Sequence, residues 1–152
     1  MTIITHILVT TVGVRFLHLT GSEAVLAYIF GVVIDLDHFI KLPLYFKKHN
    51  FKIRDILQKP FPKEKHYNWR TSLQEPVALL WIIPLSIFLK TPAPVIFFAG
   101  HLILDYLMSY QKLPFYPFSD FRTKGFFIGI PDMIKEVFII IASSICIIFS
   151  LL

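Results

Sequence analysis

The stretch that decides the fold is residues 93–110, APVIFFAGHLILDYLMSY. It is largely apolar over about five helical turns, yet it carries His101 and Asp105, four residues apart. That spacing places both side chains on one face of a helix, one turn from each other. A charge in such apolar surroundings is costly unless it is compensated. We therefore expect either a shared divalent cation or a buried hydrogen bond between this histidine and this aspartate.

Four further apolar segments accompany this one, and the five run over residues 3–19, 23–40, 73–89, 93–110 and 131–152. The length of each segment is close to the ~20 residues that a helix needs to cross the hydrocarbon core of a membrane. The chain is 55% hydrophobic and only 16% charged, whereas soluble domains are about 25% charged. We therefore predict one all-α domain over residues 1–152, an integral membrane bundle of about five helices. Pro84 predicts a kink or a break in the third segment.

Positive charge is concentrated in the connection after the second segment. Residues 41–72 carry nine basic residues, namely Lys41, Lys47, Lys48, Lys52, Arg54, Lys59, Lys63, Lys65 and Arg70. Such charge marks cytoplasmic loops. The other long connection, 111–130, lies on the same side under an alternating topology, so we predict both as cytoplasmic loops of a multi-pass cell-membrane protein whose N-terminus is cytoplasmic. The basic loop is expected to contact anionic membrane lipid, and no nucleic-acid partner is expected because no binding motif is present.

The metal-capable side chains lie at the cytoplasmic ends of the predicted segments, at one common depth. Imidazoles and carboxylates are ligands for zinc and manganese ions. The candidate ligands are His6, Asp35, Asp37, His38, His66, His101 and Asp105. His18 and His49 fall elsewhere along the predicted topology and are left out of the site.

The run Asp35-Leu36-Asp37-His38 ends the second segment. In a regular helix Asp35 and Asp37 diverge by about 200°, so either they serve two metal ions or the helix ends there and the chain turns back. Asp35 and His38 share a face. The alternative is a polar helix end in the headgroup region, where an aspartate meets an unfavourable helix dipole.

Glu75 and Arg70 flank the start of the third segment. Glu75 can close a capping box with Thr71 or Ser72, or it can act at the metal site. Arg70 can pair bidentately with a phosphate or a carboxylate, or it can contact lipid headgroups.

Four motifs follow one another in the chain: Thr5-His6, Gly31-x3-Asp35-x-Asp37-His38, His66-x4-Thr71-Ser72-Leu73 and His101-Leu102-x2-Asp105. Together they resemble the membrane-bound metal-dependent hydrolases, a family related by its motifs to zinc enzymes of the phospholipase C and P1 nuclease type. The third motif departs from the family pattern, because Arg70-Thr71 stands where the family carries Thr-His. Glu75, about one helical turn further on, is our candidate to replace the missing histidine as a ligand or as a base.

The resemblance implies a hydrolase in which the seven candidate ligands hold one or two divalent ions, zinc or manganese. The expected substrate is an ester, most simply a phosphoester of a lipid or lipid-linked small molecule at the cytoplasmic membrane face. Glu75 would serve as general base and Arg70 would steady the anionic substrate. The alternative is a metal-binding membrane protein without catalysis, either a scaffold or a transport component. A third hypothesis is a metal-free bundle that docks partners through its basic loop.

Overall fold

The computed structural model describes residues 2–36, 72–109, 111–119, 121–127 and 129–150. Its helices are α1 (Ile3–Phe16), α2 (Gly21–Gly31), α4 (Leu79–Leu89), α5 (Ala93–Leu107) and α6 (Asp132–Phe149). Three short 3-10 turns, η1 (Val33–Leu36), η3 (Ser72–Gln74) and η4 (Pro76–Ala78), adjoin them. Two antiparallel two-residue strands, β1 (Gln111–Lys112) and β2 (Thr123–Lys124), pair with each other. The predicted all-α class is confirmed for the described residues.

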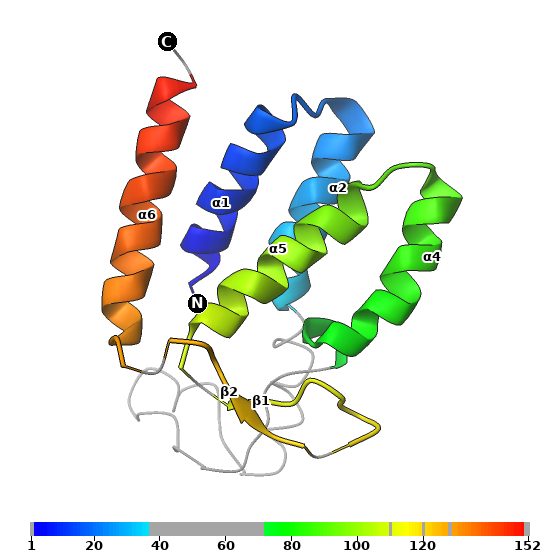
Figure 1. Cartoon of the computed structure of the whole chain (residues 1–152). Coiled ribbons are helices and arrows are strands. Elements are labelled where there is room, and N and C mark those ends of the chain that lie inside the picture. The colour runs from blue at the N-terminus through cyan, green and yellow to red at the C-terminus, as the bar shows by residue number, and fades with distance from the viewer. Residues whose placement is uncertain (1, 37–71, 110, 120, 128, 151–152) are drawn as a thin grey trace, which may run out of the picture.

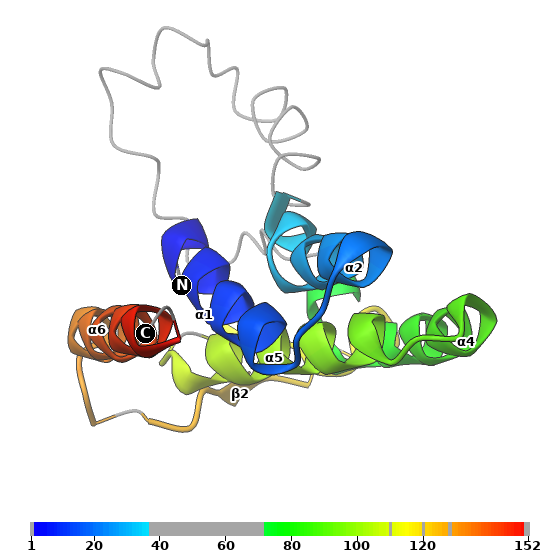
Figure 2. The ribbon, with the colours of Figure 1, turned by 90° about the horizontal axis from the view of Figure 1, so that it is seen from above.

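Helix α5 lies at the centre of the bundle and contacts α2, α4 and α1, while α1 also packs against α6 (Figures 1 and 2). The start of α1, the end of α2 with η1, and the second half of α5 all lie at the end of the bundle that carries β1 and β2 (Figure 1). This arrangement brings residues from three elements to the same end of the molecule.

The third predicted segment begins differently from the expectation of one helix over 73–89. Residues 72–78 form η3 and η4, and α4 starts only at Leu79. Glu75 between the two turns is extended, with φ −121° and ψ 156°, because a residue that precedes proline is disfavoured in the helical region, and Pro76 follows it. Pro84 lies inside α4, so it does not break the helix.

Close backbone packing sets the distance between α1 and α2. A Cβ atom built at Gly31 would overlap the hydroxyl of Thr10, so only glycine allows this approach. The central core is formed around Phe98, which is fully buried against Ala78, Ile82 and Leu102. These contacts hold α4 and α5 together and support the end of α2.

Large apolar side chains also cover much of the outer surface. Phe16, Trp81 and Phe88 are 80%, 78% and 80% exposed. Among the described residues, no helix combines the length and the apolar character required to cross a membrane.

Candidate metal centre

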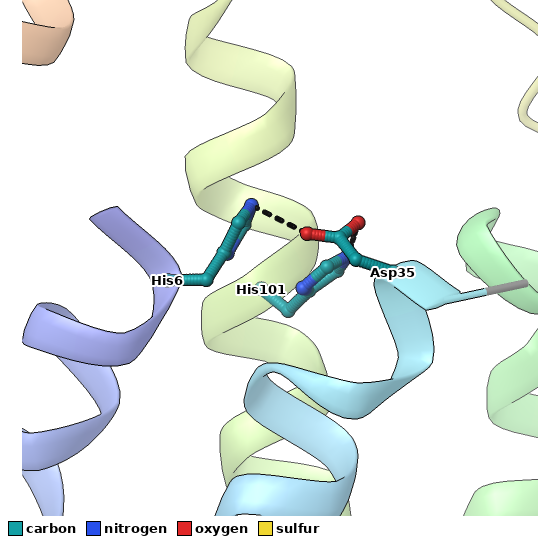
Figure 3. A group of neighbouring side chains, drawn as sticks. All are labelled: His6, Asp35 and His101. Atoms are coloured by element: carbon teal, nitrogen blue, oxygen red, sulfur yellow. Dashed lines mark ion pairs between the residues drawn. The ribbon is translucent and has the colours of Figure 1, made fainter. Parts of the chain in front are cut away.

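Three residues from three elements converge at this end of the bundle (Figure 3). His6 comes from the first turns of α1, Asp35 from η1, and His101 from the middle of α5. One ligand atom from each lies within 4.8 Å of the others. The Nε2 atom of His6 is 3.3 Å from Asp35 Oδ2, and the Nε2 atom of His101 is 3.5 Å from Asp35 Oδ1. Asp35 therefore lies between the two histidines.

The tautomer of His101 follows from its other ring nitrogen. Nδ1 lies 3.3 Å from the carbonyl oxygen of Gly31, and a carbonyl only accepts, so Nδ1 carries the proton. In a neutral ring Nε2 then has a bare lone pair, and this lone pair faces a carboxylate oxygen of Asp35. Two acceptors repel unless a cation lies between them. A histidine that donates one ring N–H to a carbonyl while its second nitrogen faces a carboxylate is the arrangement typical of metal ligands.

The neutral form of His101 is favoured by its surroundings. Burial lowers the pKa of His101 below its ordinary value of 6.5, and the neighbouring His6 acts in the same direction, while Asp35 and Asp105 oppose it. The two imidazole rings are stacked with centroids 4.3 Å apart. Two positive charges at that separation would repel each other.

The spacing of the cluster fits a small divalent ion better than it fits ion pairs. Charge-assisted N–H···O bonds are about 2.7–2.9 Å long, and the contacts here are 3.3 and 3.5 Å. Neighbouring ligand atoms around a tetrahedral zinc with bonds near 2.1 Å lie about 3.4 Å apart. Both His6 ring nitrogens and His101 Nε2 are buried and have no hydrogen-bond partner among the described residues. His6, Asp35 and His101 could therefore hold a metal ion.

Asp105 approaches the cluster from the side of His6, since its Oδ1 atom is 3.5 Å from His6 Nε2. His101 and Asp105 are both 2% exposed, on one buried face of α5. Asp105 is not among the three residues whose ligand atoms all lie within 4.8 Å of one another, so a metal ion shared by His101 and Asp105 stays a prediction. His101 is grouped with Asp35 and His6, and Asp105 lies against His6.

Gln74 is a site residue that the sequence did not suggest. Its Nε2 donates to Asp35 Oδ1 at 3.2 Å and to the carbonyl oxygen of Ile34 at 3.5 Å. The amide thus orients the carboxylate and the backbone of η1 together. The site residue predicted in this segment was its neighbour Glu75. An amide carries no charge, so a glutamine gives no metal-ligand signal in a sequence.

Glu75 is buried but belongs to an adjoining polar cluster. Its carboxylate accepts from the Tyr106 hydroxyl at 2.9 Å and from the backbone N–H of Leu113 at 3.2 Å. Lys112 is fully buried beside them. Its Nζ donates to the carbonyl oxygen of Asp105 and lies 5.3 Å from the Tyr106 ring centroid. The base or ligand role of Glu75 remains a prediction.

The start of α1 is anchored on the side opposite the cluster. Glu136 on α6 accepts from the backbone N–H of Thr2 at 2.7 Å and from the Thr5 hydroxyl at 2.8 Å. Partial burial acts to raise the pKa of Glu136, but these hydrogen bonds outweigh it and hold the pKa below its ordinary value of 4.5. Thr5 therefore fixes α1 against α6 while its neighbour His6 points to the centre of the bundle.

Four predicted site residues, Asp37, His38, His66 and Arg70, lie outside the described residues. So do all nine basic residues of the 41–72 loop, and the orientation deduced from them stays a prediction. His18, which was left out of the site, lies at the far end of α1, in the turn before α2. Comparison with known proteins finds no matching family model, no matching curated protein and no matching solved structure.

Proposed function

We propose that the chain is a metal-dependent hydrolase whose metal centre is formed by His6, Asp35 and His101. The observation that carries the proposal is the lone pair of His101 Nε2, which is buried and directed at an Asp35 oxygen 3.5 Å away. Three protein ligands of the histidine and carboxylate type are the pattern of catalytic zinc sites, which leave one coordination position for water or substrate. A divalent ion held there would lower the pKa of a bound water molecule to about 7 and so supply a nucleophile at neutral pH.

The surrounding residues supply positioning and proton acceptance. Gln74 holds Asp35, and the side chain of Asp35 is 15% exposed while both histidine side chains are fully buried. The open side of the centre is therefore the side of η1. Glu75 is the proposed general base, supported by its burial and by two donors that fix the position of its carboxylate. A carboxylate can accept a proton from water.

The proposed substrate is a phosphoester of a lipid or lipid-linked molecule, and the proposed location is a membrane. The support is the apolar outer surface: Phe16, Trp81, Phe88 and Phe138 are each more than two-thirds exposed, and extensive exposed apolar surface marks sites of membrane or protein interaction. Acyl chains would cover these side chains. The cytoplasmic orientation of the site belongs to the same proposal and rests on the basic loop of 41–72.

A metal-binding protein without catalysis is the second candidate, and Asp105 is the observation that favours it. With its Oδ1 3.5 Å from His6 Nε2, Asp105 is placed to act as a fourth ligand. A site with four protein ligands is closed and structural.

The test compares two histidine variants in detergent-purified protein stripped with a chelator and reloaded with zinc or manganese. His101→Asn should lose bound metal and hydrolysis together. His18→Asn is the matched control, because asparagine tolerates the positive φ of 51° at that position, and it should retain both. Metal is counted by elemental analysis. Hydrolysis is followed with a phosphomonoester, a phosphodiester and a lipid phosphoester.

Three outcomes decide between the candidates. Metal binding with turnover of any of the three substrates supports the hydrolase. Stoichiometric metal without turnover of any of them supports the closed, structural site. Equal metal content in wild type and His101→Asn would refute the centre itself.

A further inference from the structure

A cavity lies at the opposite end of the bundle from the metal centre. It has a volume of about 840 Å³ and is walled by the last turns of α1 and α6. These two helices pack against each other with their carboxyl ends at the same end of the molecule (Figure 1). Arg15 lies nine positions after His6 along α1, which corresponds to about 14 Å of helix. The cavity is therefore a separate site.

The walls of the cavity are apolar and its edge is basic. Phe16, Ile145 and Phe149 supply hydrocarbon surface, and Arg15 and His18 supply hydrogen-bond donors. A volume of this size accommodates a drug-sized or acyl-chain ligand, since ligand pockets span about 300–1,000 Å³.

The guanidinium of Arg15 joins the two helices through a hydrogen bond to Ser150. Its Nη1 donates to the Ser150 hydroxyl at 3.1 Å, and no ion pair joins it to a carboxylate in the part of the chain that the structure describes. The acidic residue nearest to it in sequence, Glu23, accepts from the Thr91 hydroxyl at 2.9 Å on another turn and does not line the cavity. Among the described residues the guanidinium makes one hydrogen bond, and a planar guanidinium can bind a phosphate through two parallel N–H groups.

We propose that this cavity binds one anionic phospholipid, with an acyl chain between α1 and α6 and its phosphate on Arg15 and His18. Apolar walls beside a cation that forms no ion pair with the described residues match an anionic amphiphile. A soluble anion would leave the walls uncovered, and a zwitterionic lipid would bring an ammonium group next to the guanidinium. The binding uses no residue of the metal centre, so it stands or falls independently of the hydrolase activity.

Cys146 makes the cavity directly observable. It is the one cysteine in the chain, it is exposed, and it lines the cavity. A lipid in the cavity should shield its thiol from a maleimide. With the lipid at about ten times its dissociation constant, about one molecule in eleven has an empty cavity, so the labelling rate should fall about tenfold.

The experiment uses wild-type protein in detergent with a chelator present, and it measures the maleimide labelling rate of Cys146. Phosphatidylglycerol is added in one arm, phosphatidylcholine with the same acyl chains in a second, and inorganic phosphate in a third. We expect slowing by phosphatidylglycerol alone. Equal slowing by phosphatidylcholine would overturn recognition of the anionic headgroup. Equal slowing by inorganic phosphate would make this a free-anion site, and unchanged rates in all arms would refute the proposal.

Variants of Arg15 test whether the slower labelling of Cys146 depends on the contact between the guanidinium and the lipid phosphate. Arg15→Gln should lose most of the slowing by phosphatidylglycerol, and Arg15→Lys should retain part of it. Lys90→Gln is the matched control, because Lys90 is an exposed basic residue in the turn between α4 and α5, at the same end of the bundle (Figure 1), and does not line this cavity. Full slowing in Arg15→Gln would overturn the assignment. If Arg15→Gln does not fold, the comparison of the two lipids on wild type decides the proposal.

Discussion

Asp35→Asn is the sharpest test of the metal centre, because Asp35 takes part in both close contacts between the carboxylate and the imidazoles, at 3.3 and 3.5 Å. Asparagine keeps the shape and leaves an oxygen to accept from Gln74, so the fold should survive. It removes the negative charge and places an N–H₂ group beside a histidine nitrogen, which weakens any ion bound there.

The size of the expected effect on the unfolding free energy follows from linkage between metal binding and folding. At a zinc concentration of about 100 times the dissociation constant, wild-type protein gains about 2.7 kcal/mol in unfolding free energy. Mutations beyond the ligands themselves weaken metal sites by about 10- to 100-fold, and loss of a ligand should cost at least the upper value. At the same zinc concentration the variant then gains only about 0.4 kcal/mol.

The assay is equilibrium unfolding of detergent-purified protein, with chelator and with zinc, followed by circular dichroism. Asp132→Asn is the matched control. Asp132 pairs with Lys135 at 2.9 Å, away from the cluster, so this variant should lose some stability and still gain fully from zinc. If zinc stabilises Asp35→Asn as much as wild type, the ion does not bind at His6, Asp35 and His101, and the reasoning is refuted.

Three further outcomes are expected. Glu75→Gln should keep bound metal but slow hydrolysis at least tenfold, measured as kcat beside metal content; full activity would remove Glu75 from the base role. Gly31→Ala should destabilise by about 1–3 kcal/mol and weaken metal binding, because its methyl overlaps the Thr10 hydroxyl, and adding Thr10→Ala should restore part of both. Because the folded pKa of Glu136 lies below 4.5, its stabilisation is present above that pH and is lost as the pH falls through the folded pKa. Urea unfolding of wild type and Glu136→Gln should therefore converge in acid, and a constant difference would contradict this account.

The helices themselves were predictable because each is a continuous apolar run. The segments predicted over 3–19, 93–110 and 131–152 correspond to α1, α5 and α6. The second segment was predicted over 23–40, but α2 ends at Gly31 and the 3-10 turn η1 follows it. At the start of the third segment the expectation was also wrong, and there local sterics explain the difference. Pro76 forces the preceding residue into an extended conformation, and this information was already present in the sequence.

Contacts within the site were less accessible to prediction. Lys112 lies in the connection 111–130, which was predicted as a cytoplasmic loop, yet it is fully buried. A lysine in a polar segment gives the same signal whether it faces solvent or lies under a tyrosine ring. Gln74 was overlooked for a related reason, since its role depends on which carboxylate lies opposite it, and Asp35 is 39 residues away.

By itself, the sequence of this protein determined the all-α class, because continuous apolar runs are a local property of the chain. It also predicted one end of the bundle at which metal-capable residues would gather. Only the tertiary structure decided which of those residues meet. His6, Asp35 and His101 share one point because Gly31 lets α1 and α2 approach closely, because η1 turns Asp35 inward, and because the Gly31 carbonyl orients His101. The cavity beside Arg15 likewise exists only where the ends of α1 and α6 come together. Such meetings are set by packing between segments distant in the chain, and no local pattern encodes them.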